Sequence, residues 1–253
     1  MPVSLLTLNV HNPVIGPDII RLRDFFNESG AEVLALSECS RVAFDALATA
    51  LDCKGTSYAP APFWGNGILT RSLPLHPLES VIMSPLHSGE ERSAAVGEIT
   101  VHGTSLRLVS THLAHGSEEE RQHQLAQLTH HTTLDLSSSI LLGDLNALTR
   151  TDYTDSRWQV ICGQRKRAGI SPPSANLMDG LRDGLHFADA VDASSAPRHE
   201  TRTTSRFGTR VDYILRGPTC AARWVPDTYR VVPTRAQNIS DHEAVAVDIE
   251  VFR

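Results

Sequence analysis

The chain has 253 residues, of which 21% are charged and 41% hydrophobic, and its net charge is −6. This composition excludes an intrinsically disordered protein, and the length suits one large domain, which we expect to span residues 1–253. The negative charge argues against a protein that holds duplex DNA by bulk electrostatics. The N-terminus lacks the basic region and cleavage site of a secretion signal, and no apolar run is long enough to span a membrane. We therefore expect a cytoplasmic monomer.

The charge is unevenly distributed along the sequence. Residues 150–230 contain 13 Lys and Arg against 9 Asp and Glu, whereas the remainder contains 10 against 20. This local excess indicates either a solvated basic loop or a phosphate-facing surface. Such a surface would use Arg198, Arg202, Arg206 and Arg210.

Short apolar runs rich in β-branched residues alternate with segments of helical periodicity. In chain order, we predict a strand over Val3–Val10, a helix over Asp18–Ser29, a strand over Val33–Ser37, a helix over Arg41–Leu51, strands over Gly67–Leu69, Ala94–Val101 and Ser105–Thr111, a helix that begins at Ser117, and strands over Ile140–Leu142, Val211–Leu215 and Ala244–Val251. The order indicates an α/β fold in which two packed sheets carry helices on their outer sides.

Cap residues mark the starts of two predicted helices. Ser40 precedes the helix over Arg41–Leu51, and Ser117 and Glu120 have the spacing of a capping box. Two regions are predicted to be irregular, Tyr58–Gly67 and Gln164–Ser205. Long irregular segments of a compact domain often carry binding sites.

A polar residue lies at or next to the end of nearly every predicted strand. These residues are Asn9, Glu38, His112, Asp144, Asp212, Asp241 and His242. If the sheets align these ends, four carboxylates converge on one point and repel one another unless a cation neutralises them. Carboxylate and amide oxygens suit Mg²⁺ or Mn²⁺ better than zinc. The sequence therefore predicts a site for a hard divalent cation.

Two pairs within this set suggest how the site could act. Asp144 and Asn146 are two residues apart, so in an extended segment both point to the same side. One could accept a proton from water, and the other could donate a hydrogen bond to an oxyanion. Asp212 and His242 could form a carboxylate–imidazole pair that acts on a phosphate. The sequence leaves open whether Asp144 or His242 is the base.

Seven motifs carry a family resemblance. They are TLNVH, ALSEC, ERSAAVGEI, STHLAHG, GDLNA, RVDYIL and SDH, and they span residues 7 to 242. In order and spacing they resemble the endonuclease/exonuclease/phosphatase superfamily. The resemblance implies a DNase I-like four-layer α/β/β/α sandwich of two mixed β-sheets flanked by helices. It also implies hydrolysis of a phosphomonoester or phosphodiester with Mg²⁺ or Mn²⁺.

The resemblance assigns roles to the residues of these motifs. It implies that Glu38 binds the metal, with Asn9 and Asp241 nearby, and that Asp144 and Asn146 act on the attacking water and the phosphate. It also implies that Asp212 orients His242 and that His112 is a second phosphate-side donor or acid. Two positions depart from the family pattern. Ser37 stands where the family usually has Gln, and His112 stands where abasic-site endonucleases have Tyr. The chain is more similar to the His-bearing DNase I-like, sphingomyelinase-like and tyrosyl-DNA phosphodiesterase-like branches.

Further residues are candidates for contact with the substrate phosphate. Arg92 offers a bidentate guanidinium but could equally be a surface arginine, and Asn66 could support the site or lie in a turn. Arg206 and Arg210 belong to the basic segment described above. The leading expectation is a nuclease or a nucleic-acid-end phosphodiesterase. The alternatives are a hydrolase of a small or lipid phosphate, such as an inositol phosphate or sphingomyelin, and a non-catalytic binding domain.

Overall fold

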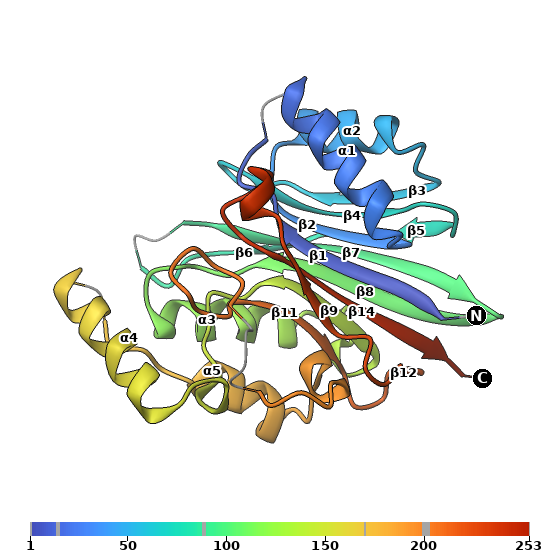
Figure 1. Ribbon diagram of the computed structural model, residues 1–253. Coiled ribbons are helices and arrows are strands. Elements are labelled where there is room, and N and C mark those ends of the chain that lie inside the picture. The colour runs from blue at the N-terminus through green and yellow to red at the C-terminus, as the bar shows by residue number, and fades with distance from the viewer. Residues whose placement is uncertain (1, 14–15, 88–89, 170, 199–202, 253) are drawn as a thin grey trace.

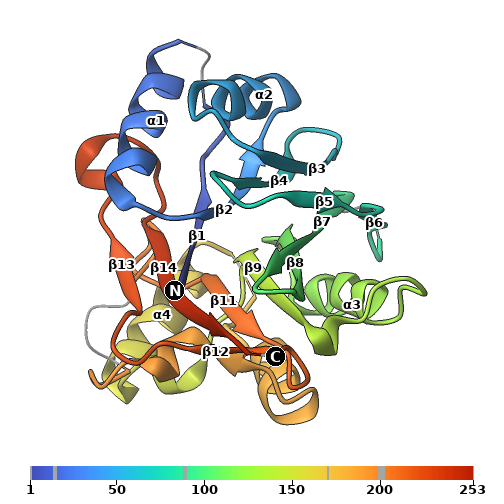
Figure 2. The same cartoon turned by 90° about the vertical axis from the view of Figure 1, so that its right-hand side faces the viewer.

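The protein folds into four layers, which Figures 1 and 2 show from two sides. The computed structural model describes residues 2–13, 16–87, 90–169, 171–198 and 203–252. Two β-sheets pack face to face, α1 and α2 cover the first sheet, and α3 and α5 lie over the second with α4 beside them. The helices are α1 (Pro17–Ser29), α2 (Arg41–Ala50), α3 (Glu118–Thr129), α4 (Asp155–Arg167) and α5 (Asn176–Asp179). The predicted α/β/β/α fold is confirmed.

The first sheet has seven strands, with β1 near its centre. Its order is β12 (Ala222–Trp224), β14 (Ala244–Val251), β1 (Val3–Asn9), β2 (Val33–Cys39), β4 (Gly65–Thr70) and β3 (Gly55–Ala59), and β13 (Arg230–Val232) also pairs with β14. β1 and β2 are parallel, whereas β14 is antiparallel to β1. The sheet is therefore mixed, as predicted.

The second sheet is also mixed and has seven strands. Its order is β10 (Ala188–Asp189), β11 (Asp212–Arg216), β9 (Ser139–Asp144), β8 (Thr104–His112), β7 (Arg92–Val101) and β5 (Leu75–Pro77), and β6 (Val81–Met83) also pairs with β7. β8 and β9 are parallel, and β11 is antiparallel to β9. The strands that the sequence did not predict have two to five residues, too few to show a periodicity.

Three hydrophobic clusters fill the three interfaces between the layers. Leu5, Ile99 and Ile140 belong to the cluster between the sheets. Phe26 and Phe44 belong to the cluster that α1 and α2 form with the first sheet. A third cluster joins the second sheet to α3 and α5. The two sheets are therefore held in a fixed relative position, on which any site that draws residues from both depends.

Helix capping follows the sequence in part. The Ser40 and Ser117 side chains accept hydrogen bonds from backbone N–H groups of α2 and α3, as predicted. A full capping box would also have the Glu120 carboxylate accept from the backbone N–H of Ser117. This part of the prediction is wrong, because that carboxylate accepts from the backbone N–H of Leu86 instead. The segment predicted to be irregular, Gln164–Ser205, contains the last turn of α4, the short helix α5 and β10.

Within the described residues, no helix is both long enough and apolar enough to cross a lipid bilayer.

Candidate active site

Strand direction brings the predicted residues of the first sheet to one edge. β1 and β2 are parallel, so Asn9 and Glu38 lie where both strands end. β14 runs the other way, so Asp241 and His242, which precede it, lie at the same edge. The first sheet thus contributes one amide, two carboxylates and one imidazole.

The second sheet supplies the remaining residues at the same place. His112 and Asp144 are register partners at the ends of β8 and β9, and Asp212 is opposite Asp144 at the start of β11. Gly143 has a φ of 139°, and a Cβ there would lie 1.9 Å from the carbonyl oxygen of Thr111. Only glycine permits this close approach of β9 to β8 directly before Asp144.

Asp144 lies at the centre of the cluster and is 1% exposed. Its Oδ1 accepts from the backbone N–H of Asn146 at 2.9 Å, and its Oδ2 accepts from Nδ2 of Asn9 at 3.2 Å. Burial and the nearby Asp212 carboxylate raise the pKa of Asp144 to about 7. Asp144 can therefore gain or lose a proton near neutral pH, as a general base requires.

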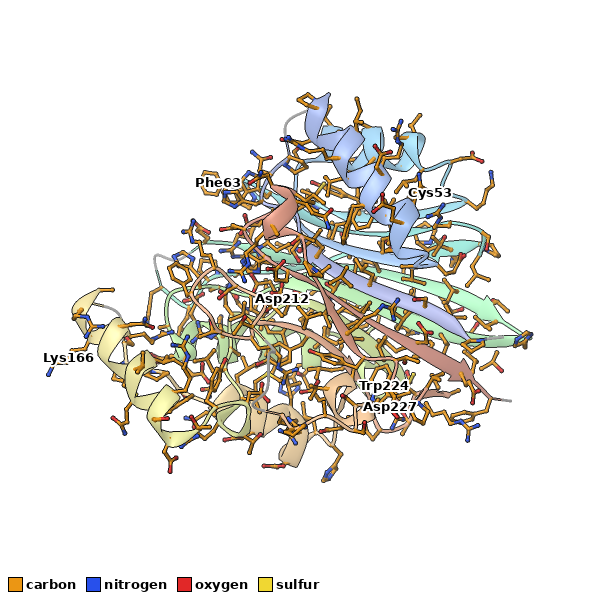
Figure 3. The ribbon with its side chains drawn as sticks, in the orientation of Figure 1. Cys53, Phe63, Lys166, Asp212, Trp224 and Asp227 are labelled. Carbon is orange, nitrogen blue, oxygen red and sulfur yellow. The ribbon has the colours of Figure 1, made fainter. Side chains whose placement is uncertain are left out.

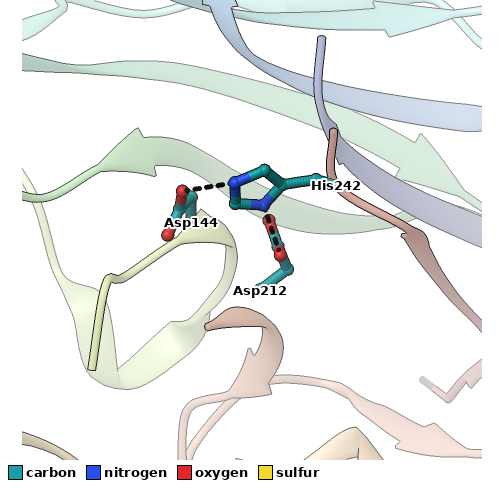
Figure 4. Close-up of side chains that lie close together, drawn as sticks. All are labelled: Asp144, Asp212 and His242. Atoms are coloured by element: carbon teal, nitrogen blue, oxygen red, sulfur yellow. Dashed lines mark hydrogen bonds and ion pairs between the residues drawn. The ribbon is translucent and has the colours of Figure 1, made fainter. Parts of the chain in front are cut away.

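Asp212 and His242 form the predicted carboxylate–imidazole pair, which Figure 4 shows beside Asp144. His242 Nδ1 lies 2.8 Å from Asp212 Oδ2, and His242 Nε2 lies 3.8 Å from Asp144 Oδ2. Burial disfavours the imidazolium, but the carboxylates of Asp212, Asp144 and Asp241 together outweigh it and raise the pKa of His242 to about 10. His242 is therefore a cation at neutral pH, with Nε2 directed toward Asp144.

His112 is buried and neutral. Burial and the nearby Arg92 guanidinium hold its pKa well below the usual value. Asn146 Nδ2 lies 2.9 Å from His112 Nε2 and 3.0 Å from the carbonyl oxygen of Leu113. The amide therefore donates both of its hydrogens, and His112 Nε2 is an acceptor. In this arrangement His112 Nε2 holds the Asn146 amide, and the Asn146 oxygen is left as an acceptor. The role of His112 as a phosphate-side donor or acid stays a prediction.

The Asn9 side chain hydrogen-bonds on both sides of its amide, and its role near the metal stays a prediction. Its side-chain oxygen accepts from the backbone N–H of His11 at 3.0 Å, while its nitrogen donates to Asp144. The amide thus joins the end of β1 to the central carboxylate. Ser37, where the family usually has Gln, is buried, and its hydroxyl has no hydrogen-bond partner among the described residues.

The donor set fits a divalent cation. Glu38 and Asp241 flank His11, whose Nδ1 is 3.4 Å from Glu38 Oε2 and 3.6 Å from Asp241 Oδ1. One oxygen each of Asp144 and Asp212 and one nitrogen of His242 lie within 4.8 Å of one another. Within the described parts of the chain, Oδ1 of Asp212 and Oδ1 of Asp241 are buried without a hydrogen-bond partner. Oxygens in this state, in a group of four carboxylates, suit a bound cation.

The match to a family model extends over nearly the whole sequence. The model of the endonuclease/exonuclease/phosphatase family matches residues 6–242. The chain belongs to this family. Enzymes of the family are metal-dependent phosphoesterases. No curated protein sequence matches the chain.

Solved structures share this endonuclease/exonuclease/phosphatase fold at low sequence identity. An endonuclease/exonuclease/phosphatase from Beutenbergia cavernae is 21% identical, with a TM-score of 0.71 over 99% of this chain and 72% of that one. D. rerio TDP2 with a single-strand DNA product is 18% identical, with a TM-score of 0.65 over 99% of both chains. A mannosyl-6-phosphatase from Bacteroides thetaiotaomicron is 15% identical, with a TM-score of 0.62 over 98% of this chain and 99% of that one.

Two polar residues that were expected to contact the substrate are buried in this protein. Asn66 is 1% exposed, and its Nδ2 donates to the carbonyl oxygen of Ser93 at 2.8 Å, which ties β4 to β7. Arg92 is 7% exposed, and its guanidinium lies between Glu90 and His112. Arg92 thus contacts the site residue His112, whereas the printed contacts of Asn66 join two strands.

Two arginines of the basic segment pair with carboxylates and do not form the predicted phosphate-facing surface. Arg210 is 1% exposed and pairs with both Asp152 and Asp189, so it has no access to a substrate. Arg198 pairs with Asp152 and Asp192. Arg202 lies outside the described residues. Of the four arginines, Arg206 is the one seen at the site, with Nη1 at 3.3 Å from Asp241 Oδ2 and a side chain 59% exposed.

His11 is the residue of the site that sequence reasoning missed. Its signal was present in TLNVH, two residues after Asn9. His11 lies two residues beyond the end of β1, so the pattern of polar residues at strand ends did not include it.

Proposed function

We propose that this chain hydrolyses a phosphoester with a divalent cation, Mg²⁺ or Mn²⁺, by direct attack of water on phosphorus. The observation that carries the proposal is the group around Asp144. It combines a carboxylate whose pKa is about 7 with an imidazole whose pKa is about 10, 3.8 Å apart. Two titratable groups whose environments set their pKa values apart are typical of acid and base partners.

The charge states assign the two roles. Asp144, deprotonated, accepts the proton of the attacking water, and the free oxygen of Asn146 accepts the water's other hydrogen. His242, protonated and held by Asp212, stabilises the negative charge that develops on the phosphoryl oxygens. These charge states support Asp144 as the base, a choice that the sequence left open.

Glu38 and Asp241 would hold the cation, with Asp144 and Asp212 nearby. When bound, the cation supplies positive charge to a phosphoryl oxygen and to the surrounding carboxylates. Because Asp144 is partly protonated without such charge, the cation would also favour its basic form.

One exposed turn favours a nucleic-acid end as the substrate. Ser205 forms a β-bridge with His242, and the next residues, Arg206 and Phe207, are exposed, Phe207 by 68%. The turn is held in place, since Gly208 donates to the carbonyl oxygen of Ser205 at 3.0 Å and Arg157 donates to that of Gly208 at 2.8 Å. A fixed aromatic ring beside a guanidinium fits a base next to a phosphate.

A second candidate, a small phosphate ester, is favoured by charge and shape. The buried pairs of Arg198 and Arg210 remove two cations from the predicted phosphate-facing surface. A pocket of about 450 Å³ is lined by His11, Ser240 and Asp241, among others, although Asp144 and His242 do not line it. This volume is within the range of small-molecule sites.

A substrate panel tests the proposal and separates the two candidates. The panel contains single- and double-stranded DNA, RNA, a 5′-tyrosyl DNA end, sugar and inositol phosphates, sphingomyelin and bis-p-nitrophenyl phosphate, each with Mg²⁺, Mn²⁺ or EDTA. We expect hydrolysis that requires the ion and is lost in Asp144→Ala and His242→Ala but kept in His102→Ala, at the opposite end of the second sheet. Activity that survives both site variants would contradict the proposal.

A further inference from the structure

Helix α4 buries fewer residues for its length than the other α-helices. Of its 13 residues, all of which the structure describes, only Ile161 is buried, whereas α1, a helix of the same length, buries four residues. Helices of folded proteins are normally stabilised by an apolar face that packs on the core. Figure 3 shows Lys166, in the last turn of α4, at the outer margin of the protein. Most of the surface of α4 is therefore open to a partner.

The exposed surface of α4 is basic, although the whole chain carries a net charge of −6. The helix contains one carboxylate, that of Asp155, and four cations, those of Arg157, Arg165, Lys166 and Arg167. Asp155 is engaged, because it pairs with Arg150 outside the helix. Lys166 and Arg167 are exposed and form no ion pair with any residue that the structure describes. Cations in the last turn of a helix stabilise its dipole, but these two are also available to an external anion.

Both ends of α4 lie beside the edge of the fold that carries the active site. Near the start of the helix, Arg157 donates to the carbonyl oxygen of Gly208 at 2.8 Å, in the exposed turn described above. Near its end, burial and the nearby Arg121 guanidinium of α3 lower the pKa of Arg165. Arg121 in turn donates to the carbonyl oxygen of Ala114 at 3.1 Å, two residues after the end of β8 in the site. The helix therefore extends along the site from the exposed turn to the start of α3.

A glycine leaves part of the surface of α4 without a side chain. Gly163 lies in the interior of the helix, where glycine is less favourable than alanine by about 1 kcal/mol. A Cβ at this position would contact only Nη1 of Arg167, at 3.4 Å, so packing does not require glycine. Glycine is common where another backbone or a ligand approaches closely. Here it gives a bulky anion access to the Arg167 guanidinium.

We propose that α4 binds the phosphate backbone of a single-stranded nucleic acid whose reacting phosphate lies at Asp144. The inference rests on the proposed function, and within it on the nucleic-acid candidate. Arg206 and Phe207 contact the nucleotides nearest the site, and α4 continues the same path with cations that match the charge of the phosphates. From Arg157 to Lys166 the helix is about 14 Å long, at 1.5 Å per residue. This length corresponds to about four stacked nucleotides at 3.4 Å each.

The salt dependence of oligonucleotide binding tests the proposal. Dissociation constants of single-stranded DNA of about 4, 8 and 12 nucleotides are measured by fluorescence anisotropy with Mg²⁺ and from about 50 to 200 mM NaCl. Asp144→Asn is present in every protein to prevent hydrolysis. The test variant is Lys166→Gln with Arg167→Gln.

Two controls separate local charge from net charge and from helix stability. Lys54→Gln with Arg223→Gln removes the same charge elsewhere, since Figure 3 shows their sequence neighbours Cys53 and Trp224 on the side away from Lys166. Gly163→Glu and Gly163→Gln both replace glycine with a good helix former. Only Gly163→Glu adds a carboxylate, which can pair with Arg167 one turn later.

We expect the affinity of the unaltered helix to rise with oligonucleotide length, because longer strands reach α4. Lys166→Gln with Arg167→Gln should lower the slope of log K against log[salt] by about 1.4, which is 0.7 for each of two phosphates. It should also weaken binding of the longest strand roughly 5–10-fold at about 50 mM salt. The charge control and Gly163→Gln should bind as the unaltered helix does, whereas Gly163→Glu should bind more weakly. With Asp144 restored, all variants should hydrolyse bis-p-nitrophenyl phosphate at the wild-type rate, because this ester is too short to reach α4.

The outcomes separate this inference from the function on which it rests. If wild-type protein cleaves neither single-stranded DNA nor RNA, the nucleic-acid candidate of the proposed function is wrong. If it cleaves them but the α4 variants keep the affinity and salt slope of the unaltered helix, the inference fails alone. Equal losses in Gly163→Glu and Gly163→Gln would show that the shape of the helix matters and its charge does not. Unchanged oligonucleotide binding with lost binding to anionic phospholipid vesicles would assign α4 to a membrane surface instead.

Discussion

Replacing Arg210 with Met should destabilise the fold strongly, because its guanidinium neutralises two buried carboxylates. Its Nε lies 2.6 Å from Asp152 Oδ2, and its terminal nitrogens lie 3.1 and 2.7 Å from the two oxygens of Asp189. All three residues are at most 6% exposed. Removing one partner of a buried ion pair costs about 3–5 kcal/mol of unfolding free energy. At ~2–4 °C per kcal/mol for a chain of this size, the melting temperature should fall by roughly 6–20 °C.

The loss should depend on pH with a defined sign. Burial disfavours the Asp189 carboxylate, but Arg210 outweighs it, so the pKa of Asp189 lies below its usual value. This residue therefore stabilises the wild type above its unfolded pKa of about 3.9, and the stabilisation is lost as pH falls through the folded pKa. In Arg210→Met, burial is opposed only by the backbone N–H of Val191 and by the more distant Arg198, so the pKa of Asp189 should rise. The variant should then lose stability as pH rises from about 4, by up to ~1.4 kcal/mol per pH unit, until the raised pKa is passed.

Urea unfolding between pH 4 and pH 8 measures both effects. The matched control is Arg223→Met, because Arg223 pairs with Glu250 at 2.9 and 2.7 Å but is 72% exposed. Exposed pairs contribute about 0–1 kcal/mol, so the control should remain close to wild type at every pH. An Arg210→Met deficit below about 1 kcal/mol, or one that does not grow with pH, would refute the argument from burial.

Three further predictions concern the site. Asp144→Asn should lower the rate of hydrolysis by about 10²–10⁴-fold with an unchanged circular dichroism spectrum; activity within tenfold of wild type would exclude Asp144 as the base. Asp212→Asn should lower the pKa of His242 from about 10 toward its ordinary value, as followed by NMR titration of the imidazole, and an unchanged titration would show that Asp212 does not set the charge of His242. Phe207→Ala should raise KM for an oligonucleotide by roughly 5–100-fold, while Phe252→Ala, also exposed, should not; equal effects in both would remove the turn from the substrate site.

The sequence predicted the site residues that belong to strand ends. Asn9, His112 and Asp144 close strands, and parallel pairing brings such ends together, so a simple rule located them. The fold followed from the order of the motifs. The long strands were predicted to within a few residues because their apolar runs show a clear pattern.

The errors have a common physical origin in contacts between distant segments. Arg210 looked like a surface cation because its partners, Asp152 and Asp189, are 58 and 21 residues away in sequence. The Asn146 amide donates one hydrogen to His112 and the other to the carbonyl oxygen of Leu113, 34 and 33 residues earlier. Residue type and spacing identify groups that can bind or react, but they do not show which of these groups another part of the chain has already engaged.

The position of β14 has a consequence for synthesis of the protein. β14 pairs with β1, so β1 has no partner on that side until residues 244–251 have been made. Asn9 and His242 come to the same edge of the sheet only then, whereas β7, β8 and β9 can pair earlier. Until that moment the nascent chain exposes an open β-edge, which chaperones and other nascent chains can contact. Hydrolytic activity should consequently appear only after translation has passed the last strand, and truncated products should be inactive.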